Sequence, residues 1–349
     1  MDKKYAADHN ISSALHLLNN LTMKMIKNIV ITISVLFLLS ACNNNSQVET
    51  KIEAYFLPPP TTYNYKIING FKMFYREAGD TSKPTLVLLH GYPSSSHTYR
   101  DLIPMLATHY HIIAPDNLGS GYSDHPNPDS ITYTFDLLAA QTSKLLKALQ
   151  VKDYIMYMQD FGAPVGYRIL MENPKYIKAL IVQNANAYLE GLTPKRQTFF
   201  RTAQTDTSQE KYDFLYSLTS REAIIEKQYL FDIDSLNYHT QNPDAWVHDL
   251  VFLTSEKDRK IQVQLFQDYN TNLIRYPQWQ EMLRTTQLKT LIVWGGKDLK
   301  FNANGAKAYL EDLPKAELHL LDAGHFAAEE KTVEVATLIL RFLEKNGIK

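Results

Sequence analysis

The chain has 349 residues, and its 36 lysine and arginine side chains nearly balance 37 aspartate and glutamate side chains, which leaves a formal net charge of −1. A nucleic-acid-binding protein normally carries a clear basic excess or stripe, so this balance argues against that class. Hydrophobic residues make up 45% of the chain and charged residues 21%, a globular composition that excludes a disordered protein. The single cysteine, Cys42, excludes an intrachain disulfide and a cysteine-based metal cluster.

The region around Cys42 has the pattern of an export signal. Residues 29–39 are almost entirely apolar, Lys24 and Lys27 precede them, and the sequence Leu-Ser-Ala-Cys ends at Cys42. The run is shorter than the roughly 20 residues of a membrane span, and a charged start, a short apolar core and small residues before a cleavage point are typical of a secretory signal. The segment resembles a bacterial lipoprotein signal. That resemblance implies a lipid on Cys42 and anchorage in the cell envelope, on a periplasmic or outer-membrane face; the alternative is a short anchor helix with an incidental cysteine.

We therefore divide the N-terminal region into two parts that lie ahead of the fold. Residues 1–41 are interpreted as an extension and signal peptide, and residues 42–56 as a polar tether. Met23 and Met25 are alternative starts to Met1, because the residues ahead of Met23 do not belong to the signal pattern.

From about residue 63 onward, short β-type runs alternate with longer helical patterns. The dipeptide Asn69-Gly70 lies between two of the runs and predicts a β-hairpin. Six further runs are apolar enough to be strands buried on both faces: 85–89, 111–114, 154–158, 179–182, 290–294 and 318–321. Helical patterns such as 134–149 and 333–343 separate them. The alternation predicts an α/β fold with a mainly parallel, eight-stranded sheet flanked by helices and with the hairpin at one edge.

One long interval interrupts this alternation. Residues 186–284 show no buried strand pattern, and contain aromatic and charged helical patterns such as 211–218 and 261–272. We interpret residues 186–284 as an inserted helical cap, or lid. Residues 57–185 and 285–349 would then form one core domain around the insertion.

Chemically active side chains directly follow three of the predicted parallel strands. They are Asp160, Asp298 and His325. Because the carboxyl ends of parallel strands meet at one edge of a sheet, we expect these side chains to lie close together. Each has an alternative reading: Asp160 could cap the next helix, Asp322 could replace Asp298 as the acid beside the histidine, and His325 could be a core residue.

This order of residues resembles the α/β-hydrolase fold, and the resemblance covers residues 57–349. The turn Gln159-Asp160-Phe161-Gly162 looks like the nucleophile elbow of that family, a strained turn that exposes one side chain. The resemblance implies that Asp160 is the nucleophile, His325 the general base and Asp298 the acid that orients the base. The chain contains no Gly-x-Ser-x-Gly motif, which argues against a serine esterase or lipase.

An aspartate nucleophile implies a particular class of reaction. A carboxylate can displace a leaving group from saturated carbon and form an alkyl-enzyme ester. His325 would then activate a water molecule to hydrolyse the ester, while the backbone N–H groups of Tyr92 and Phe161 would form the oxyanion hole. Water, carboxylates and an imidazole suffice, so we expect no metal and no organic cofactor. The expected substrate is small, apolar and uncharged.

Two enzyme classes of this kind are in question, epoxide hydrolase and haloalkane dehalogenase. Phe161 follows the nucleophile, where dehalogenases resembling this chain have a tryptophan whose N–H holds the halide. Epoxide hydrolases of the family often have an aromatic residue at the position of Tyr92, so we favour this class, although Met158-Gln159 looks more like dehalogenases. A non-catalytic, lipid-anchored binding protein on the same fold is a third hypothesis.

The resemblance also implies where substrate-binding residues should lie. Epoxide hydrolases use two lid tyrosines to protonate the opening epoxide oxygen, and Tyr269 occupies a matching place in the chain. Tyr212 or Tyr216 could be the second tyrosine. His90 precedes the oxyanion loop, and we expect it to brace that loop beside the substrate.

Overall fold

The computed structural model describes residues 58–348, so the predicted signal, tether and lipidation site at Cys42 lie outside the described residues. An eight-stranded sheet has the strand order β1-β2-β4-β3-β5-β6-β7-β8. The strands are β1 (Thr62–Ile68), β2 (Phe71–Ala78), β3 (Thr85–Leu89), β4 (His111–Pro115), β5 (Tyr154–Gln159), β6 (Ile177–Gln183), β7 (Lys289–Gly295) and β8 (Glu317–Leu321). The β1–β2 and β2–β4 pairs are antiparallel, and the other five neighbouring pairs are parallel. The predicted α/β fold with a mainly parallel sheet is confirmed.

The hairpin forms at one edge of this sheet because its turn residues tolerate left-handed backbone. Asn69 has φ 51° and Gly70 has φ 84°, and Ile68 pairs directly with Phe71 across the turn. Two consecutive positive φ angles define the tight turn whose twist matches that of the flanking strands.

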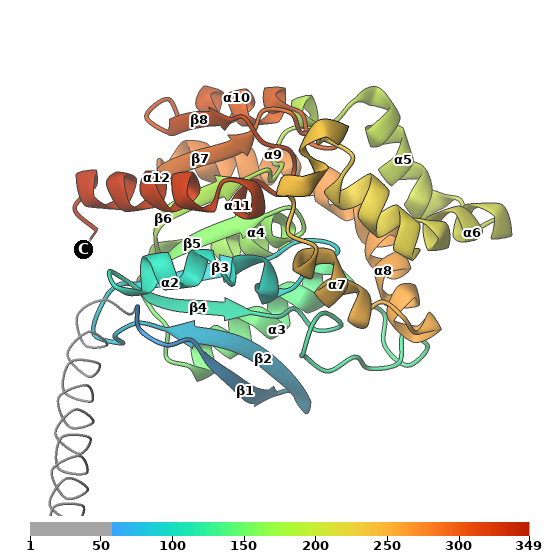
Figure 1. Cartoon of the computed structure of the whole chain (residues 1–349), viewed down its shortest axis with the longest axis horizontal. Helices are drawn as coiled ribbons and strands as arrows, with labels where there is room; N and C mark the ends of the chain where they lie inside the picture. Colours follow the sequence, from blue (N-terminus) through green and yellow to red (C-terminus); the bar gives the residue numbers. More distant parts are fainter. Residues whose placement is uncertain (1–57, 349) are drawn as a thin grey trace, which may run out of the picture. The chain divides into compact units, whose positions relative to one another are not determined.

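Helices cover both faces of the sheet (Figure 1). Alternate residues of β3 enter different cores: Leu86 and Leu88 belong to the cluster that contains residues of α2 and α12, whereas Val87 and Leu89 belong to the cluster with α3 and α4. This two-sided burial explains the continuous apolar runs. The helices of this part of the chain are η1 (Ser96–Tyr99), α2 (Leu102–Ala107), α3 (Phe135–Ala148), α4 (Gly162–Glu172), η2 (Pro174–Tyr176), α10 (Ala303–Asp312), α11 (Ala327–Glu330) and α12 (Thr332–Lys345).

The interval between β6 and β7 contains helices and, within the described chain, no strand. Its elements are η3 (Leu189–Gly191), α5 (Pro194–Thr205), α6 (Gln209–Ser217), the π-helix η4 (Ala223–Tyr229), η5 (Ser235–Thr240), α7 (Asp244–Val251), α8 (Glu256–Asp268) and α9 (Asn270–Thr286). In Figure 1, α5 to α8 gather beyond one end of the sheet. None of the helices within residues 58–348 is both long and apolar enough to cross a membrane.

The helical pattern over residues 261–272 turns out to span two helices. α8 ends at Asp268 and α9 begins at Asn270, with Tyr269 between them. The Asp268 carboxylate accepts a 2.7 Å hydrogen bond from the backbone N–H of Phe135, and the Tyr269 ring is 1% exposed and stacks on Phe200. Tyr269 keeps helical backbone angles, with φ −59° and ψ −30°, so the interruption between the two helices is one residue long.

Candidate active site

Asp160 lies in a strained turn between β5 and α4. Its φ of 49° is in the left-handed region that few non-glycine residues adopt, and its carbonyl accepts a 3.0 Å hydrogen bond from the N–H of Ala163. The turn requires glycine at position 162, because a Cβ there would lie 2.2 Å from the backbone oxygen of Leu89. The backbone therefore holds the Asp160 side chain at the carboxyl edge of the sheet.

The loop after β3 holds one oxygen of this carboxylate. The backbone N–H of Tyr92 donates a 2.8 Å hydrogen bond to Oδ1 of Asp160. Gly91 permits the approach, since a Cβ there would lie 2.3 Å from Cβ of Asp160. Among the described residues, the second predicted donor, the N–H of Phe161, makes no hydrogen bond to Asp160, whose Oδ1 is bound to Tyr92 and whose Oδ2 faces His325.

His325 connects the two carboxylates. Its Nε2 atom lies 3.3 Å from Oδ2 of Asp160, and its Nδ1 atom lies 2.7 Å from Oδ2 of Asp298. All three side chains are buried, with exposed fractions of 6% for Asp160, 2% for Asp298 and 2% for His325. The structure thus brings together the three residues that follow separate strands in the sequence.

The electrostatics of this group favour a charged imidazole. Burial by itself lowers the pKa of His325, but the carboxylates of Asp298 and Asp160 outweigh burial and raise the pKa to about 9. Burial by itself raises the pKa of Asp298, and the adjacent His325 more than compensates, so the pKa of Asp298 is lowered. The free enzyme therefore holds a protonated histidine between two carboxylates at neutral pH.

Asp298 is fixed by hydrogen bonds from three directions. Its Oδ1 atom accepts from the backbone N–H groups of Lys300 at 2.7 Å and Phe301 at 2.9 Å. Its Oδ2 atom accepts from the side-chain amide of Asn184 at 2.8 Å. The alternative acid, Asp322, is exposed and forms an ion pair with Lys297, at 2.6 Å, so it does not compete for His325.

Asn184 was not singled out from the sequence, although a usable signal existed. It directly follows β6, and the same argument from strand ends that located Asp160 applies to it. Its φ is 44°, and its Oδ1 atom accepts a 2.9 Å hydrogen bond from the N–H of Gly295. The side chain therefore ties the end of β7 to the Asp298 carboxylate.

A cavity of about 210 Å³ opens onto Asp160. Its walls combine aromatic rings with basic side chains, and several of them come from the inserted helical interval. The lining residues are Tyr92, Asp160, Phe161, Arg196, Phe199, Phe200, Leu218, Lys227, Gln228, Phe231, Phe266, Lys300 and Phe301.

The predicted substrate-binding residues do not line this cavity. Tyr212 and Tyr216 stack on each other, with ring centroids 6.1 Å apart, and the guanidinium of Arg259 lies 3.7 Å from the centroid of the Tyr216 ring. α6 packs against α8 here, and neither ring is among the residues that line the cavity at Asp160. His90 is buried behind the oxyanion loop, where its ring contacts the Gly91 carbonyl at 3.0 Å.

Tyr269 lies close to the cavity, behind its aromatic wall. Its ring centroid is 3.8 Å from that of Phe200 and 5.4 Å from that of Phe161. A second tyrosine near it is Tyr276, whose buried hydroxyl interacts with that of Tyr269. Burial raises the pKa of both hydroxyls, and the negative charge of Asp160 raises both further. Tyr276, and not Tyr212 or Tyr216, therefore lies with Tyr269 in the field of Asp160.

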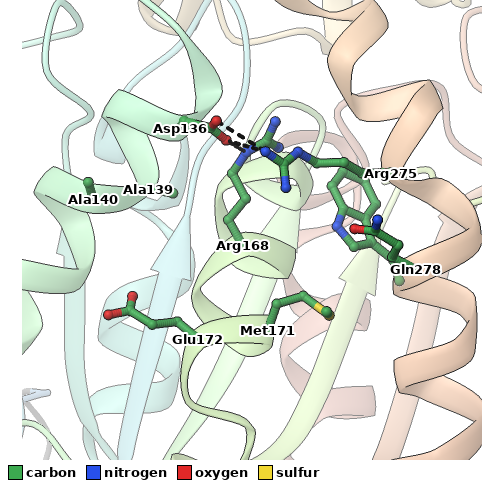
Figure 2. Close-up of a pocket in the computed structure, with 9 residues that line it drawn as sticks. Asp136, Ala139, Ala140, Arg168, Met171, Glu172, Arg275 and Gln278 are labelled. Atoms are coloured by element: carbon green, nitrogen blue, oxygen red, sulfur yellow. Dashed lines mark hydrogen bonds and ion pairs between the residues drawn. The ribbon is translucent and has the colours of Figure 1, made fainter.

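A larger cavity of about 280 Å³ lies elsewhere, between α3, α4 and α9, and Figure 2 shows its residues. None of the residues around Asp160 lines it. Two of its basic side chains share one carboxylate, since Arg168 and Arg275 both form ion pairs with Asp136. These ion pairs link α3, α4 and α9, and each of the two arginines has an acidic partner.

The class of protein follows from the fold, the elbow and the comparisons with known proteins. A model of the alpha/beta hydrolase fold family matches residues 84–332, so the chain belongs to this family and is an α/β-fold hydrolase. It is 34% identical over 288 residues to an uncharacterized hydrolase from Saccharomyces cerevisiae, a match that covers 81% of this chain and 97% of the yeast protein.

Two further relatives carry more specific names. A haloalkane dehalogenase from Mycobacterium marinum is 35% identical over 127 residues, which cover 35% of this chain and 42% of the dehalogenase. The crystal structure of an epoxide hydrolase from Vigna radiata superposes with a TM-score of 0.62 at 19% identity, covering 82% of this chain and 98% of that one. At this identity the structural similarity concerns the fold alone.

Proposed function

We propose that the protein hydrolyses a small electrophile through an alkyl-enzyme ester on Asp160, and that its substrate is an epoxide. The observation that carries the proposal is the chain of contacts from Asp160 through His325 to Asp298, with distances of 3.3 Å and 2.7 Å. The backbone donor of Tyr92 on Oδ1 of Asp160 supports it, because this donor is available to the developing oxyanion.

The first step is attack on an epoxide carbon. Oδ2 of Asp160 forms the new C–O bond, the ring C–O bond breaks, and the ring oxygen takes a proton from a tyrosine hydroxyl. Tyr269 and Tyr276 are the donors that the geometry favours. The pairing of these two buried hydroxyls in the field of the Asp160 carboxylate supports this assignment, since a positioned phenol can donate its proton to the opening ring.

The second step is hydrolysis of the ester. His325 takes a proton from water, and the hydroxide attacks Cγ of Asp160 while Oδ1 carries the oxyanion charge beside the N–H of Tyr92. The tetrahedral intermediate then collapses and releases the diol, whose new hydroxyl oxygen takes the proton from His325. The Asp160 carboxylic acid that is formed loses its proton, which returns through solvent to the tyrosinate. Ester formation removes the charge of Asp160 and lowers the pKa of His325, so the imidazolium of the free enzyme first releases its proton to solvent and the neutral imidazole then acts as the base. His325 regains a proton from solvent when the Asp160 carboxylate re-forms.

A haloalkane is the second candidate substrate, because of the similarity to the dehalogenase from Mycobacterium marinum. The cavity lining, as far as the structure describes it, contains no tryptophan or asparagine that could hold a departing halide. Phenol groups near Asp160 suit an opening epoxide, which needs a proton, better than a halide leaving group. We therefore place epoxides first.

A single turnover in H₂¹⁸O tests the nucleophile directly. If Asp160 attacks carbon, the first diol contains oxygen from the enzyme, so it is unlabelled, and ¹⁸O appears in the Asp160 carboxylate. Labelled diol in the first turnover would show that water attacks the substrate and would overturn the proposal. The His325→Gln variant should accumulate a protein heavier by the mass of one substrate, and Asp160→Asn should not.

Parallel assays then separate the substrate classes. Diol formation from aryl and alkyl epoxides is compared with halide release from chloro- and bromoalkanes at equal enzyme concentration. Faster diol formation is expected. Halide release alone would favour the dehalogenase, and no turnover or adduct with either panel would favour a non-catalytic binding protein.

The location of the protein is a separate proposal that rests on the sequence around Cys42. We propose that the mature chain begins at a lipidated Cys42 and is anchored in a bacterial envelope membrane. Expression in a bacterial host with radiolabelled palmitate should label the wild-type chain and leave the Cys42→Ser variant unlabelled.

A further inference from the structure

Arg196 is an unpaired cation in the wall of the cavity that contains Asp160. It lines the cavity from the first turn of α5. Within residues 58–348, no acceptor hydrogen-bonds to its guanidinium and no carboxylate forms an ion pair with it; its short contacts are with the rings of Phe199 and Phe200, each centroid 5.9 Å away. Its own backbone is fixed, because its N–H donates a 3.2 Å hydrogen bond to the Thr193 side chain that caps the helix.

Three other buried or partly buried basic side chains of the described residues have anionic partners. Arg100 binds Glu329 through both terminal nitrogens, at 2.7 and 2.8 Å. Arg168 forms an ion pair with Asp136. Lys300, which also lines the cavity, lies 3.0 Å from Asp232. Arg196 is the contrasting case: its side chain is only partly buried, and a guanidinium without an anionic partner in a cavity wall is free to bind an anion.

The charges around the cavity are compatible with an anion bound at Arg196. Burial lowers the pKa of Arg196, while the carboxylates of Asp298 and Asp160 act in the opposite direction from a distance. Three lining side chains are basic, namely Arg196, Lys227 and Lys300, and Asp160 is the acidic one among the described lining residues. The cavity can therefore hold an anion beside a carboxylate nucleophile without uncompensated repulsion.

We propose that Arg196 binds a carboxylate of the substrate, so that the enzyme selects small epoxides that carry a carboxylate over neutral ones. A guanidinium presents two parallel N–H donors that match the two oxygens of a carboxylate. The volume of about 210 Å³ is below the range of roughly 300–1,000 Å³ typical of drug-sized ligands, which indicates a short molecule. The inference rests on the proposed function, and it replaces the expectation of an uncharged substrate.

The test uses matched pairs of substrates. Oxirane carboxylates with zero to four methylene groups between ring and carboxylate are each compared with the corresponding primary amide. For the best-fitting length, kcat/KM of the wild-type enzyme should be about 10- to 100-fold higher for the acid than for the amide, the range expected for a charged hydrogen bond. Arg196→Gln should reduce the acid-to-amide ratio of kcat/KM to about one, mainly by raising KM for the acid. Arg196→Lys should retain part of the preference for the acid.

Arg201→Gln is the matched control, because Arg201 is an exposed residue of the same helix and its guanidinium hydrogen-bonds only Gln197 among the described residues. Its acid-to-amide ratio should equal that of the wild type. Equal rates for acids and amides in the wild type, or an equal loss for both in Arg196→Gln, would overturn the inference. Thermal unfolding checks the fold of each variant, and Arg196→Gln should melt close to the wild type, since only the contacts of the guanidinium with the rings of Phe199 and Phe200 are lost.

An unreactive ligand separates this inference from the proposed chemistry. Butyrate should raise the melting temperature of the wild type and of Arg201→Gln but not of Arg196→Gln, and butyramide should raise none of them. Butyrate binding through Arg196 without turnover of any epoxide supports the anion site while the proposed function fails. Turnover of epoxy amides without butyrate binding supports the function and overturns the anion site.

Discussion

The side-chain amide of Asn184 donates a 2.8 Å hydrogen bond to Oδ2 of Asp298, the same oxygen that contacts Nδ1 of His325. Asn184 also accepts from the N–H of Gly295 through its own Oδ1. One asparagine thus connects the ends of β6 and β7 and limits the orientations open to the Asp298 carboxylate. It is a positioning residue for the histidine, which it does not touch.

Replacing Asn184 by alanine should lower both stability and turnover. The change leaves a buried backbone N–H unpaired, which costs about 1–3 kcal/mol of the free energy of unfolding. With Asp298 less restrained, kcat should fall by about tenfold or more while KM changes little. Urea unfolding and steady-state kinetics measure the two effects. Asn237→Ala, at an exposed position, is the control, and equal kinetics in both variants would contradict the positioning role.

The raised pKa of His325 predicts a dependence of stability on pH. The pKa is about 9 in the folded protein and 6.5 in its ordinary state, so protonation stabilises the fold fully below pH 6.5. This contribution is lost as the pH rises from 6.5 through 9, and amounts to about 3 kcal/mol. The free energy of unfolding of the wild type should fall more steeply over this window than that of His325→Gln. Parallel curves would mean that the histidine is not charged between the carboxylates.

Adding one methyl group at Gly91 should disable the site. The new Cβ would lie 2.3 Å from Cβ of Asp160 and 2.7 Å from its Oδ1, so the carboxylate or the oxyanion loop must move. We expect Gly91→Ala to reduce kcat by more than about 100-fold, the usual loss when one oxyanion donor is removed. Gly296→Ala is a milder control, because its Cβ would meet its nearest atom at 3.2 Å. Similar activities in the two variants would argue against the oxyanion loop.

Removing hydroxyls identifies the tyrosines that act on the substrate. Tyr269→Phe and Tyr276→Phe should each slow ester formation from an epoxide by about 10²-fold or more, since a general acid contributes about that much. Tyr212→Phe and Tyr216→Phe should leave the rate unchanged, because their rings pack on each other and beneath Arg259. Pre-steady-state measurement of the adduct in the His325→Gln background isolates this step. A slow Tyr216→Phe variant would restore the assignment made from the sequence.

Local sequence patterns determine the strands of this protein and the positions of its main candidate catalytic residues. Apolar runs bounded by turn residues located the strands, because a strand buried on both faces must be apolar throughout. Asp160, Asp298 and His325 could then be placed on one edge, since consecutive parallel strands end on the same side of a sheet. The Asn69-Gly70 turn and the absence of a serine elbow were likewise readable from short stretches of residues.

Only the tertiary structure decided which groups surround the nucleophile. Helical periodicity in residues 186–284 does not say which face of a helix meets Asp160, so Tyr212 and Tyr216 could not be told from Tyr276, and Arg196 gave no signal. The choice of Asp298 over Asp322 likewise depends on side-chain direction, since one carboxylate is buried at 2.7 Å from His325 and the other pairs with Lys297 in solvent. Strand ends are set by neighbours along the chain, whereas the contents of a cavity are set by distant segments that meet only when the chain folds.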